Sequence, residues 1–417
     1  MMRLERIILH SDLNNYYASV ECLLHPELEG KAVAVCGDEA QRHGIVLAKS
    51  QQAKQFGIQT GMTLWQARRL CPELITIPPH FRHYIEYSRK VQQIYYRYTD
   101  LIESFGIDEC WLDVTHSAHL FGGNGQSVAQ HILKTVRQEL GLTVSIGVSF
   151  NKAFAKLGSD LKKPNAISCI GKESYRQIIW PLPVECLLGV GRSTQNKLNR
   201  FCIHTIGQLA QADPTFLQGL LGVHGCVLWQ EANGQSSSLV TPFGYSPPAK
   251  GMGHGITCPR DLLNQRETWP VFLGLCESVA YRLREAETCA TSLQLGVKDT
   301  RLLTRDIQMP LDYPTQSAIE LARAAYGLMA RRYTWEYPVR ALSVRATQLI
   351  PACQPLQLDF FCDQSARSKK LQAEQAVDAL RLRYGNNVIQ RAIFLKKDDL
   401  KLERLQEPHI LPSFAGC

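Results

Sequence analysis

Three acidic residues in two hydrophobic segments are the first candidates for chemistry. Asp12 follows the apolar stretch 6–11 (RIILHS), and Asp108 and Glu109 stand side by side within 103–115 (ESFGIDECWLDVT). Carboxylates brought together from separate strands are what a two-metal phosphoryl-transfer site requires. Two Mg²⁺ ions roughly 3.5–4 Å apart activate the attacking oxygen and neutralise the leaving phosphate, and oxygen ligands suit Mg²⁺. The residues alone leave a second interpretation open, in which these acids simply lie at strand ends and on the surface.

Length and composition limit the classes of protein to consider. The 417 residues predict two to four domains, at roughly 100–200 residues per domain. Apolar residues make up 45% of the chain and charged residues 20%, which excludes wholesale disorder. No apolar run reaches the roughly 18 residues of a membrane span, and the N-terminus lacks the pattern of a signal peptide.

Charge and cysteine usage indicate the compartment and the type of partner. Lys and Arg number 46 against 38 Asp and Glu, a net charge of +8 that is compatible with a polyanionic partner. The 14 cysteines contain no C-x-x-C pair. This argues for reduced thiols in the cytoplasm, and against both a disulfide framework and a structural zinc site.

Hydrophobic periodicity predicts the elements that must position the acids. Strands are expected at 6–11, 32–36, 44–48, 103–115 and 143–149, and helices at 16–24, 50–56, 81–102, 126–140 and 151–163. In the helix 16–24, the pattern places Tyr17, Val20, Leu23 and Leu24 on one side. One layer of strands with helices packed on it is an α+β arrangement.

The remainder of the chain divides by composition. Residues 173–238 are helical and punctuated by glycine, and 240–255 is rich in Pro and Gly, as a linker is. Residues 256–350 alternate strand-like and helical runs, which predicts a second α+β domain. After 351, the recurrence of Ala373, Val377, Leu380 and Tyr384 predicts a helix that ends at Gly385.

Three segments resemble the signature motifs of Y-family DNA polymerases. They are HSDLNNYYASVE (10–21), FGIDECWLDVT (105–115) and SIGVSFNKAFAKLGSDLKKPNA (145–166). Their order and spacing are similar to the bacterial DinB/UmuC branch, the DNA polymerase IV type. The resemblance continues through GVGRSTQNKL (189–198) and covers nearly the whole chain.

The resemblance implies a multi-domain α+β fold, a right-hand polymerase with a ferredoxin-like palm, small fingers, a helical helix-hairpin-helix thumb and an α+β little finger. The implied boundaries are palm 1–15 and 80–172, fingers 16–79, thumb 173–240, linker 241–255, little finger 256–350 and C-terminal tail 351–417.

The resemblance also assigns roles in catalysis. Asp12 and Asp108 would hold both Mg²⁺ ions, Glu109 would bind the ion that activates the primer 3′-hydroxyl, and the carbonyl of Leu13 would complete the nucleotide-side ion. Tyr17 falls at the steric gate, where an aromatic ring under the sugar rejects a 2′-hydroxyl. A core aromatic on a helix is its ordinary alternative.

Other residues would meet the triphosphate of the dNTP. Lys163 would reach it as a point charge, although a Lys-Lys-Pro run is often a solvated helix end. Tyr16 is expected to pack or to touch the triphosphate through its backbone. Gln51 stands where many relatives carry a tyrosine whose hydroxyl contacts the triphosphate, so nucleotide affinity is in doubt; Gln51 still donates a hydrogen bond, and Lys54 keeps a cation nearby.

Two further positions depart from the family pattern. Asn14 replaces a second acid that part of the family carries, and we expect this change to be tolerated. Cys202 stands where the turn of the helical hairpin often has glycine. If the backbone there needs a positive φ, a residue with a Cβ costs stability.

Two regions are expected to bind DNA without reading its sequence. In the thumb, Gly189 and Gly191 let backbone N–H groups approach a phosphate, and Arg192 and Lys197 add charge. Candidate phosphate contacts in the little finger are Arg331, Arg332, Arg340 and Arg345. Such contacts give affinity with steep salt dependence.

The segment QLDFF (357–361) resembles the short peptide that binds the bacterial sliding clamp. Its apolar side chains, Leu358, Phe360 and Phe361, would fill a groove while Gln357 meets a polar edge. An interior strand is the alternative interpretation of these five residues.

The leading hypothesis is therefore a low-fidelity, translesion, template-directed DNA polymerase. It would be a cytoplasmic monomer that uses primer-template DNA, dNTPs and two Mg²⁺ ions, and the sliding clamp would tether it. One alternative is a non-catalytic scaffold that binds DNA or the clamp, which Gln51 makes conceivable and the three acids oppose. A nucleotide cyclase is another alternative, which the thumb-like and clamp-like segments do not suit. No Walker A or G-x-G-x-x-G segment is present.

Overall fold

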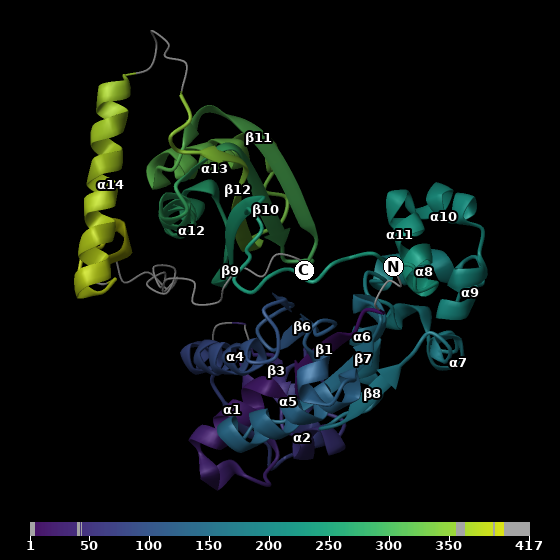
Figure 1. Ribbon diagram of the computed structural model, residues 1–417. Helices are drawn as coiled ribbons and strands as arrows, with labels where there is room; N and C mark the ends of the chain where they lie inside the picture. The colour runs from purple at the N-terminus through teal and green to yellow at the C-terminus, as the bar shows by residue number, and fades with distance from the viewer. Residues whose placement is uncertain (1–4, 40–41, 43, 356–362, 387, 396–417) are drawn as a thin grey trace. The chain divides into compact units, whose positions relative to one another are not determined.

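The computed structural model describes residues 5–39, 42, 44–355, 363–386 and 388–395 (Figure 1). The chain divides into two compact units, the first formed mainly by residues up to 246 and the second mainly by residues from 247 on. No helix among these described residues is both long enough and apolar enough to cross a membrane.

A five-stranded sheet forms the centre of the first unit. Its order is β5 (Ile102–Ser104), β6 (Glu109–Asp113), β1 (Ile8–Leu13), β7 (Val144–Ser149) and β8 (Ile167–Ile170). All six residues of β1 are buried, because β1 pairs with β6 and β7 and helices cover both faces of the sheet. Helix α5 (Gly125–Leu140) packs near Val148 on one face, and α6 (Lys152–Leu161) packs against Gly147 on the other.

The sequence predicted one strand over 103–115, and the structure shows that this is wrong. Residues 102–113 form the antiparallel hairpin β5–β6, in which Ile102 pairs with Leu112 and Ser104 with Cys110. Gly106, with φ of 88°, lies in the turn, a conformation that glycine adopts without steric cost. The expected helix 81–102 is correspondingly shorter, and α4 spans Phe81–Tyr96. Asp108 therefore stands in the turn, directly before β6.

The first unit also contains a smaller three-stranded sheet of order β3-β2-β4, with three helices that belong to the same part of the chain. These elements are β2 (Val33–Cys36), β3 (Val46–Lys49), β4 (Ile75–Ile77), α1 (Tyr16–Leu24), α2 (Gln51–Gln55) and α3 (Leu64–Leu70). Helix α1 has its predicted bounds, but its buried face was predicted wrongly. Tyr16, Ala18, Val20 and Glu21 are buried, while Leu23 and Leu24 are exposed. A charged residue inside the fold was not expected, and its partners are described below.

The predicted helical segment 173–238 is confirmed. It contains α7 (Tyr175–Ile179), α8 (Arg192–Asn199), α9 (Ile206–Gln211), α10 (Pro214–Leu221) and α11 (Val223–Ala232). The expected linker 240–255 is shorter than predicted, because β9 begins at Gly251. The glycines at 251, 253 and 255 lie against β12 (Val339–Pro351), where side chains would collide with the neighbouring strand.

The second unit is a four-stranded antiparallel sheet with two helices on one face (Figure 1). Its order is β11 (Thr304–Thr315), β10 (Thr288–Asp299), β12 (Val339–Pro351) and β9 (Gly251–Leu262), and the helices are α12 (Gln265–Glu285) and α13 (Ala318–Arg332). Leu293, Leu295 and Val344 are fully buried and form the core with the two helices. The predicted second α+β domain is present.

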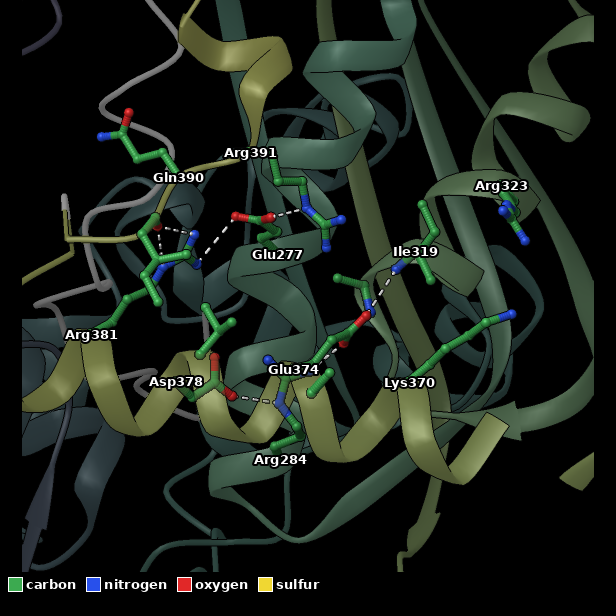
Figure 2. A pocket seen from close by; sticks show the side chains of 14 residues that line it. Glu277, Arg284, Ile319, Arg323, Lys370, Glu374, Asp378, Arg381, Gln390 and Arg391 are labelled. Carbon is green, nitrogen blue, oxygen red and sulfur yellow. Dashed lines mark hydrogen bonds and ion pairs between the residues drawn. The ribbon is translucent and has the colours of Figure 1, made fainter. Parts of the chain in front are cut away.

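The predicted C-terminal helix is α14 (Gln364–Tyr384), followed by Gly385. It packs on α12 and α13 through charged side chains rather than through an apolar stripe (Figure 2). Arg284 of α12 contacts Glu374 at 2.9 Å and Asp378 at 2.6 Å. Glu374 also accepts a hydrogen bond from the backbone N–H of Ala318, and so caps α13, whose N-cap Ser317 makes no side-chain cap of its own.

The contacts continue beyond the helix. Glu277 of α12, with a side chain only 9% exposed, is paired with Arg381 and Arg391. Phe394 follows and is part of the hydrophobic core of the second unit. A cavity of about 390 Å³ remains between α14 and the helices beneath it (Figure 2). The described part of the expected tail is therefore packed on the second unit.

Candidate active site

Pairing between β1 and β6 brings the three acidic residues together. Asp12 lies directly opposite Glu109 in the antiparallel register, and the backbone N–H of Leu13 donates to the carbonyl of Asp108 at 3.0 Å. The turn before β6 and the end of β1 therefore lie at the same edge of the sheet. The convergence that spacing alone could only suggest is present in the fold.

Burial and mutual repulsion make the two aspartates difficult to ionise. Burial raises the pKa of Asp12 to about 6, against the opposing charge of Lys163. Burial, together with the charges of Asp12 and Glu109, raises the pKa of Asp108 to about 7. Groups with such shifts concentrate at functional sites, where like charges are held close together.

Helix α6 supplies cations to two of the acids. Lys156 pairs with Glu109, and Lys163, just after the helix, lies 2.6 Å from Asp12 and 2.8 Å from Asp160. Burial opposes ionisation of Glu109, but a hydrogen bond from His10 and the charge of Lys156 outweigh it and hold the pKa at about 2. Within the described residues, no three His, Cys, Asp or Glu side chains are gathered in a formed metal cluster. The ammonium groups of Lys156 and Lys163 instead contact the carboxylates of Glu109 and Asp12.

Tyr17 of α1 stands beside the three acids and is half-buried. Its ring stacks on that of Tyr84 from α4, with centroids 4.2 Å apart and planes 9° from parallel. Burial and the negative charge of Asp108 raise the pKa of Tyr17, which places this ring near the carboxylates. Tyr16 is buried, and its hydroxyl donates to the carbonyl of Tyr84. We therefore interpret Tyr16 as a packing residue.

Behind the stacked rings lies the buried acid of α1. Glu21 is fully buried and accepts a hydrogen bond from the Tyr84 hydroxyl. His80 Nδ1 lies 3.0 Å from the same carboxylate. These partners explain how a charged residue occupies the inward face of α1. Hydrophobic periodicity did not reveal them, because each partner comes from a distant part of the chain.

Comparison with known proteins decides the family. Residues 11–160 match the impB/mucB/samB family, and residues 249–360 match the C-terminal domain of that family. DNA polymerase IV of Acetivibrio thermocellus is 44% identical over 393 residues, which cover 94% of this chain and 98% of the relative. DNA polymerase IV 1 of Bacillus subtilis is 38% identical over 400 residues, 95% of each chain. The chain belongs to the DNA polymerase IV family.

A solved structure agrees on the fold. A chimaeric Y-family DNA polymerase superposes with a TM-score of 0.72 at 21% identity, covering 83% of this chain and 99% of its own. The mixed α+β, multi-domain architecture of a Y-family polymerase, with a C-terminal little finger, is therefore confirmed. The match to residues 11–160 includes all three acids and Lys156, and Lys163 lies three residues beyond its end.

Not every family position lies in contact with the carboxylates. Gln51 begins α2, which the side chain of Ser50 caps by accepting from the N–H of Ala53, and Lys54 is exposed on the same helix. Among the described contacts, none links Gln51 or Lys54 to the three acids. Asn14 is accommodated: its side chain donates to Thr143 at 3.2 Å and accepts from Ser145 at 2.9 Å.

In the segment that was expected to form the thumb, Gly189 and Gly191 lie just before α8. Gly189 has a φ of 90°, and its carbonyl lies 3.0 Å from His224 Nε2. Gly191 is the N-cap of α8 without a side-chain cap, which leaves the N–H groups of the first turn directed outward. Arg192 and Lys197 of α8 are exposed.

The arginines proposed for the little finger do not share one surface. Arg345 is exposed on the face of β12 opposite to buried Val344 and Ala346, hence on the sheet face that α12 and α13 leave open. Arg331 and Arg332 end α13 on the helical layer, and Arg340 is half-buried. The predicted clamp residues Gln357, Leu358, Phe360 and Phe361 lie outside the described residues.

Proposed function

We propose that the chain is a template-directed, low-fidelity translesion DNA polymerase that adds dNTPs to a primer 3′-hydroxyl in DNA damage tolerance. The observation that carries the proposal is the meeting of Asp12, Asp108 and Glu109 at one edge of the sheet, with raised pKa values for the two aspartates. A scaffold has no physical need for three converging acids in a partly buried place. The names of the relatives support the same activity.

The residues fit a pair of divalent cations, which we take to be Mg²⁺. Excess negative charge is buried at the site, and hard carboxylate oxygens are the ligands that Mg²⁺ prefers. Asp12 and Asp108 would hold both ions, Glu109 the primer-side ion, and the carbonyl of Leu13 the nucleotide-side ion. When bound, the ions supply activation of the hydroxyl and neutralisation of the leaving pyrophosphate.

The protein's own side chains would position the substrates. Lys163 lies beside Asp12 and is partly exposed, so its ammonium can meet the triphosphate as a point charge. Tyr17 would contact the deoxyribose, and its stacking on Tyr84 would keep the ring in place against a ribose 2′-hydroxyl. Gln51 and Lys54 would contribute weaker contacts to the triphosphate from α2.

DNA binding would rest on phosphate contacts. The exposed first turn of α8, with Gly189, Gly191, Arg192 and Lys197, suits a phosphate at a helix N-terminus. In the little finger, Arg331, Arg332, Arg340 and Arg345 are proposed as further contacts. Residues 357–361 would bind the sliding clamp. We propose that the protein acts as a cytoplasmic monomer.

Primer extension tests the proposal directly. The protein is incubated with primer-template DNA, Mg²⁺ and all four dNTPs, beside Asp108→Ala and the control Glu86→Ala, which alters an exposed acid of α4. We expect extension by the unchanged protein and by the control, and none by Asp108→Ala, while all three bind DNA. Binding without extension by any of them would support the scaffold instead, and Gln51→Tyr would then be the next variant.

A further inference from the structure

Three side chains of α1 hold one residue of α4, Tyr84. The ring of Tyr17 stacks on the Tyr84 ring, with centroids 4.2 Å apart and planes 9° from parallel. The Tyr16 hydroxyl donates to the backbone carbonyl of Tyr84, and the Tyr84 hydroxyl donates to the carboxylate of Glu21. A single helix therefore fixes Tyr84 at its backbone, at the face of its ring and at its hydroxyl.

The spacing along α1 explains how two of these contacts reach the same ring. Tyr17 and Glu21 are four residues apart, so they lie on one side of the helix, about one turn from each other. Tyr84 spans that turn, with its ring face on Tyr17 and its hydroxyl on Glu21. Because a phenol ring is rigid, holding its hydroxyl also holds the face that Tyr17 stacks on.

Glu21 is itself held in place. Its side chain is fully buried, and His80 Nδ1 lies 3.0 Å from Oε1 and 3.2 Å from Oε2. The backbone N–H of His80 also donates to the Tyr84 hydroxyl, at 3.1 Å. Buried groups that are hydrogen-bonded in this way keep one orientation, because a different one would leave a buried polar atom unpaired.

The neighbouring rings leave one face of Tyr17 uncovered. Phe81 is 6.0 Å from the ring centroid of Tyr17 and 5.9 Å from that of Tyr84, and it is nearly perpendicular to both rings. A ring almost equally far from two stacked rings lies beside them, at their edges. Neither Phe81 nor Tyr84 therefore covers the face of Tyr17 that points away from Tyr84.

The uncovered face of Tyr17 is the surface that a sugar would meet. Its height depends on the ring beneath it: if Tyr84 shifts, Tyr17 can follow, and space opens for one more oxygen atom. Selection by contact requires the contacting groups to be held within about 0.5 Å. The hydrogen bonds of Tyr84 supply a restraint of that kind, from the side that the substrate does not reach.

We propose that Glu21 and Tyr84 are positioning residues for sugar selection: Glu21 holds the Tyr84 hydroxyl, and Tyr84 holds the ring of Tyr17 at the height that excludes a ribonucleotide. The inference rests on the proposed function, because it assumes that the protein incorporates nucleotides and that Tyr17 meets the deoxyribose.

Tyr84→Phe tests the link to Glu21, because it removes the hydroxyl and keeps the stacked ring. In single-nucleotide incorporation, we expect the ratio of kcat/KM for ribonucleotides to that for deoxyribonucleotides to rise about threefold or more, roughly the effect of one lost hydrogen bond. Equal losses for both nucleotides would contradict the proposal. Tyr98→Phe is the matched control: it removes the hydroxyl of another buried tyrosine, 3.0 Å from Thr135 Oγ1, and should leave the ratio unchanged.

Two substitutions of Glu21 test the other end of the same hydrogen bond. Glu21→Gln retains an oxygen that accepts from Tyr84 and should keep the ratio. Glu21→Met has a similar length but no strong acceptor, and it should raise the ratio as Tyr84→Phe does. Because both changes break one hydrogen bond, the double variant should raise the ratio no further than the larger single change. Thermal melting establishes that each variant is folded, and Tyr84→Phe carries the test if Glu21→Met is not.

Tyr17→Ala, which removes the gate ring, separates failure of the inference from failure of the function. If Tyr17→Ala raises the ratio while folded Tyr84→Phe leaves it unchanged, the inference is wrong and the gate stands. If Tyr17→Ala also leaves the ratio unchanged, the gate assignment is wrong, and the inference falls with it. If the unchanged protein incorporates neither kind of nucleotide, the proposed function itself is contradicted, and so is the inference.

Discussion

Gly147 of β7 and Gly158 of α6 meet backbone to backbone. A Cβ at Gly158 would lie 3.0 Å from the Cα of Gly147, and a Cβ at Gly147 would lie 1.9 Å from the carbonyl oxygen of Ala155. Gly147 of β7 is also the residue that pairs with His10 of the neighbouring strand β1. The absence of two side chains therefore lets α6 lie against the sheet, close enough for its residues to reach the acids.

Gly147→Ala should disrupt this approach. The new methyl group overlaps backbone atoms of α6, which cannot yield as a flexible side chain would, so we expect a loss of about 3 kcal/mol in the free energy of unfolding. Primer extension should fall with it. The control is Gly219→Ala, where an added Cβ meets nothing within 4 Å and helix propensity favours alanine by roughly 0.5–1 kcal/mol. Urea unfolding of both variants decides, and equal stability would contradict the close-packing argument.

The two aspartates of the site should destabilise the protein at neutral pH in the absence of metal. The pKa of Asp108 rises from an ordinary 3.8 to about 7 on folding. Because the folded state holds this proton more tightly than the unfolded state, the associated stability is complete below pH 3.8 and is lost as pH rises to about 7.

Asp108→Asn tests that linkage. In EDTA at about pH 8, the amide removes a buried charge, and we expect the free energy of unfolding to rise by on the order of 2–4 kcal/mol. The gain should shrink as the pH falls toward 4, roughly the ordinary pKa of an aspartate. Asp312→Asn, at an exposed position of β11, should show no such gain. A constant difference at every pH would show that charge is not its cause.

The turn after α8 carries a residue that its backbone does not favour. Cys202 has a φ of 59°, as its position in a glycine-favouring turn predicted. Cys202→Gly should therefore raise the free energy of unfolding by roughly 0.5–1 kcal/mol, the relief of strain exceeding the entropy that glycine costs. Cys186→Gly is the control: this residue is also exposed but is not among the residues with positive φ, so its change should lower stability. Thermal melts of the two variants should move in opposite directions.

The features that could be predicted from the sequence are those whose pattern lies within one short segment of the chain. The bounds of α1 and the end of α14 at Gly385 were found because periodicity and a terminal glycine lie within the element itself. The hairpin β5–β6 was missed because Phe105 and Ile107 continue the alternation of a strand through the turn, and Gly106 was the single local signal against it.

Side-chain partners from distant segments were the hardest to foresee. The acids were found from their residue types, but His10 and Ser159 are 149 positions apart, and nothing local to either residue indicates the other. A spacing of four residues places Lys152 and Lys156 on one face of α6, which was the available signal for Lys156. The helix of the tail was expected to pack or to contact a partner, but its charged contacts with α12 were not foreseen, since the apolar residues that recur along α14 are largely exposed.

Glu374 should contribute measurably to the stability of the second unit. It caps α13 and pairs with Arg284, whose side chain is only 9% exposed. Glu374→Ala takes one carboxylate from that guanidinium, which keeps Asp378 and the Gln316 carbonyl, and it removes the cap, so we expect a loss of about 2–3 kcal/mol. Gln375→Ala, exposed on the next position of α14, should cost less than about 0.5 kcal/mol. Denaturant unfolding compares the two, and equal midpoints would show that α14 contributes little to this unit.

The stacked ring of Tyr17 leads to a prediction about sugar selection. Tyr17→Ala removes the ring that lies 4.2 Å from Tyr84, and space opens where a 2′-hydroxyl would lie. We expect the ratio of kcat/KM for ribonucleotides to that for deoxyribonucleotides to rise by about tenfold or more.

The control variants separate this steric effect from a general loss of structure. Tyr17→Phe keeps the ring and should keep the ratio. Tyr245→Ala alters an exposed aromatic of the first unit and should leave kcat/KM unchanged for both nucleotides. Single-nucleotide incorporation with matched ribo- and deoxyribonucleotides supplies both constants. If Tyr17→Ala lowers both equally, the ring supports the fold without selecting the sugar, because a gate must act on the ribonucleotide alone.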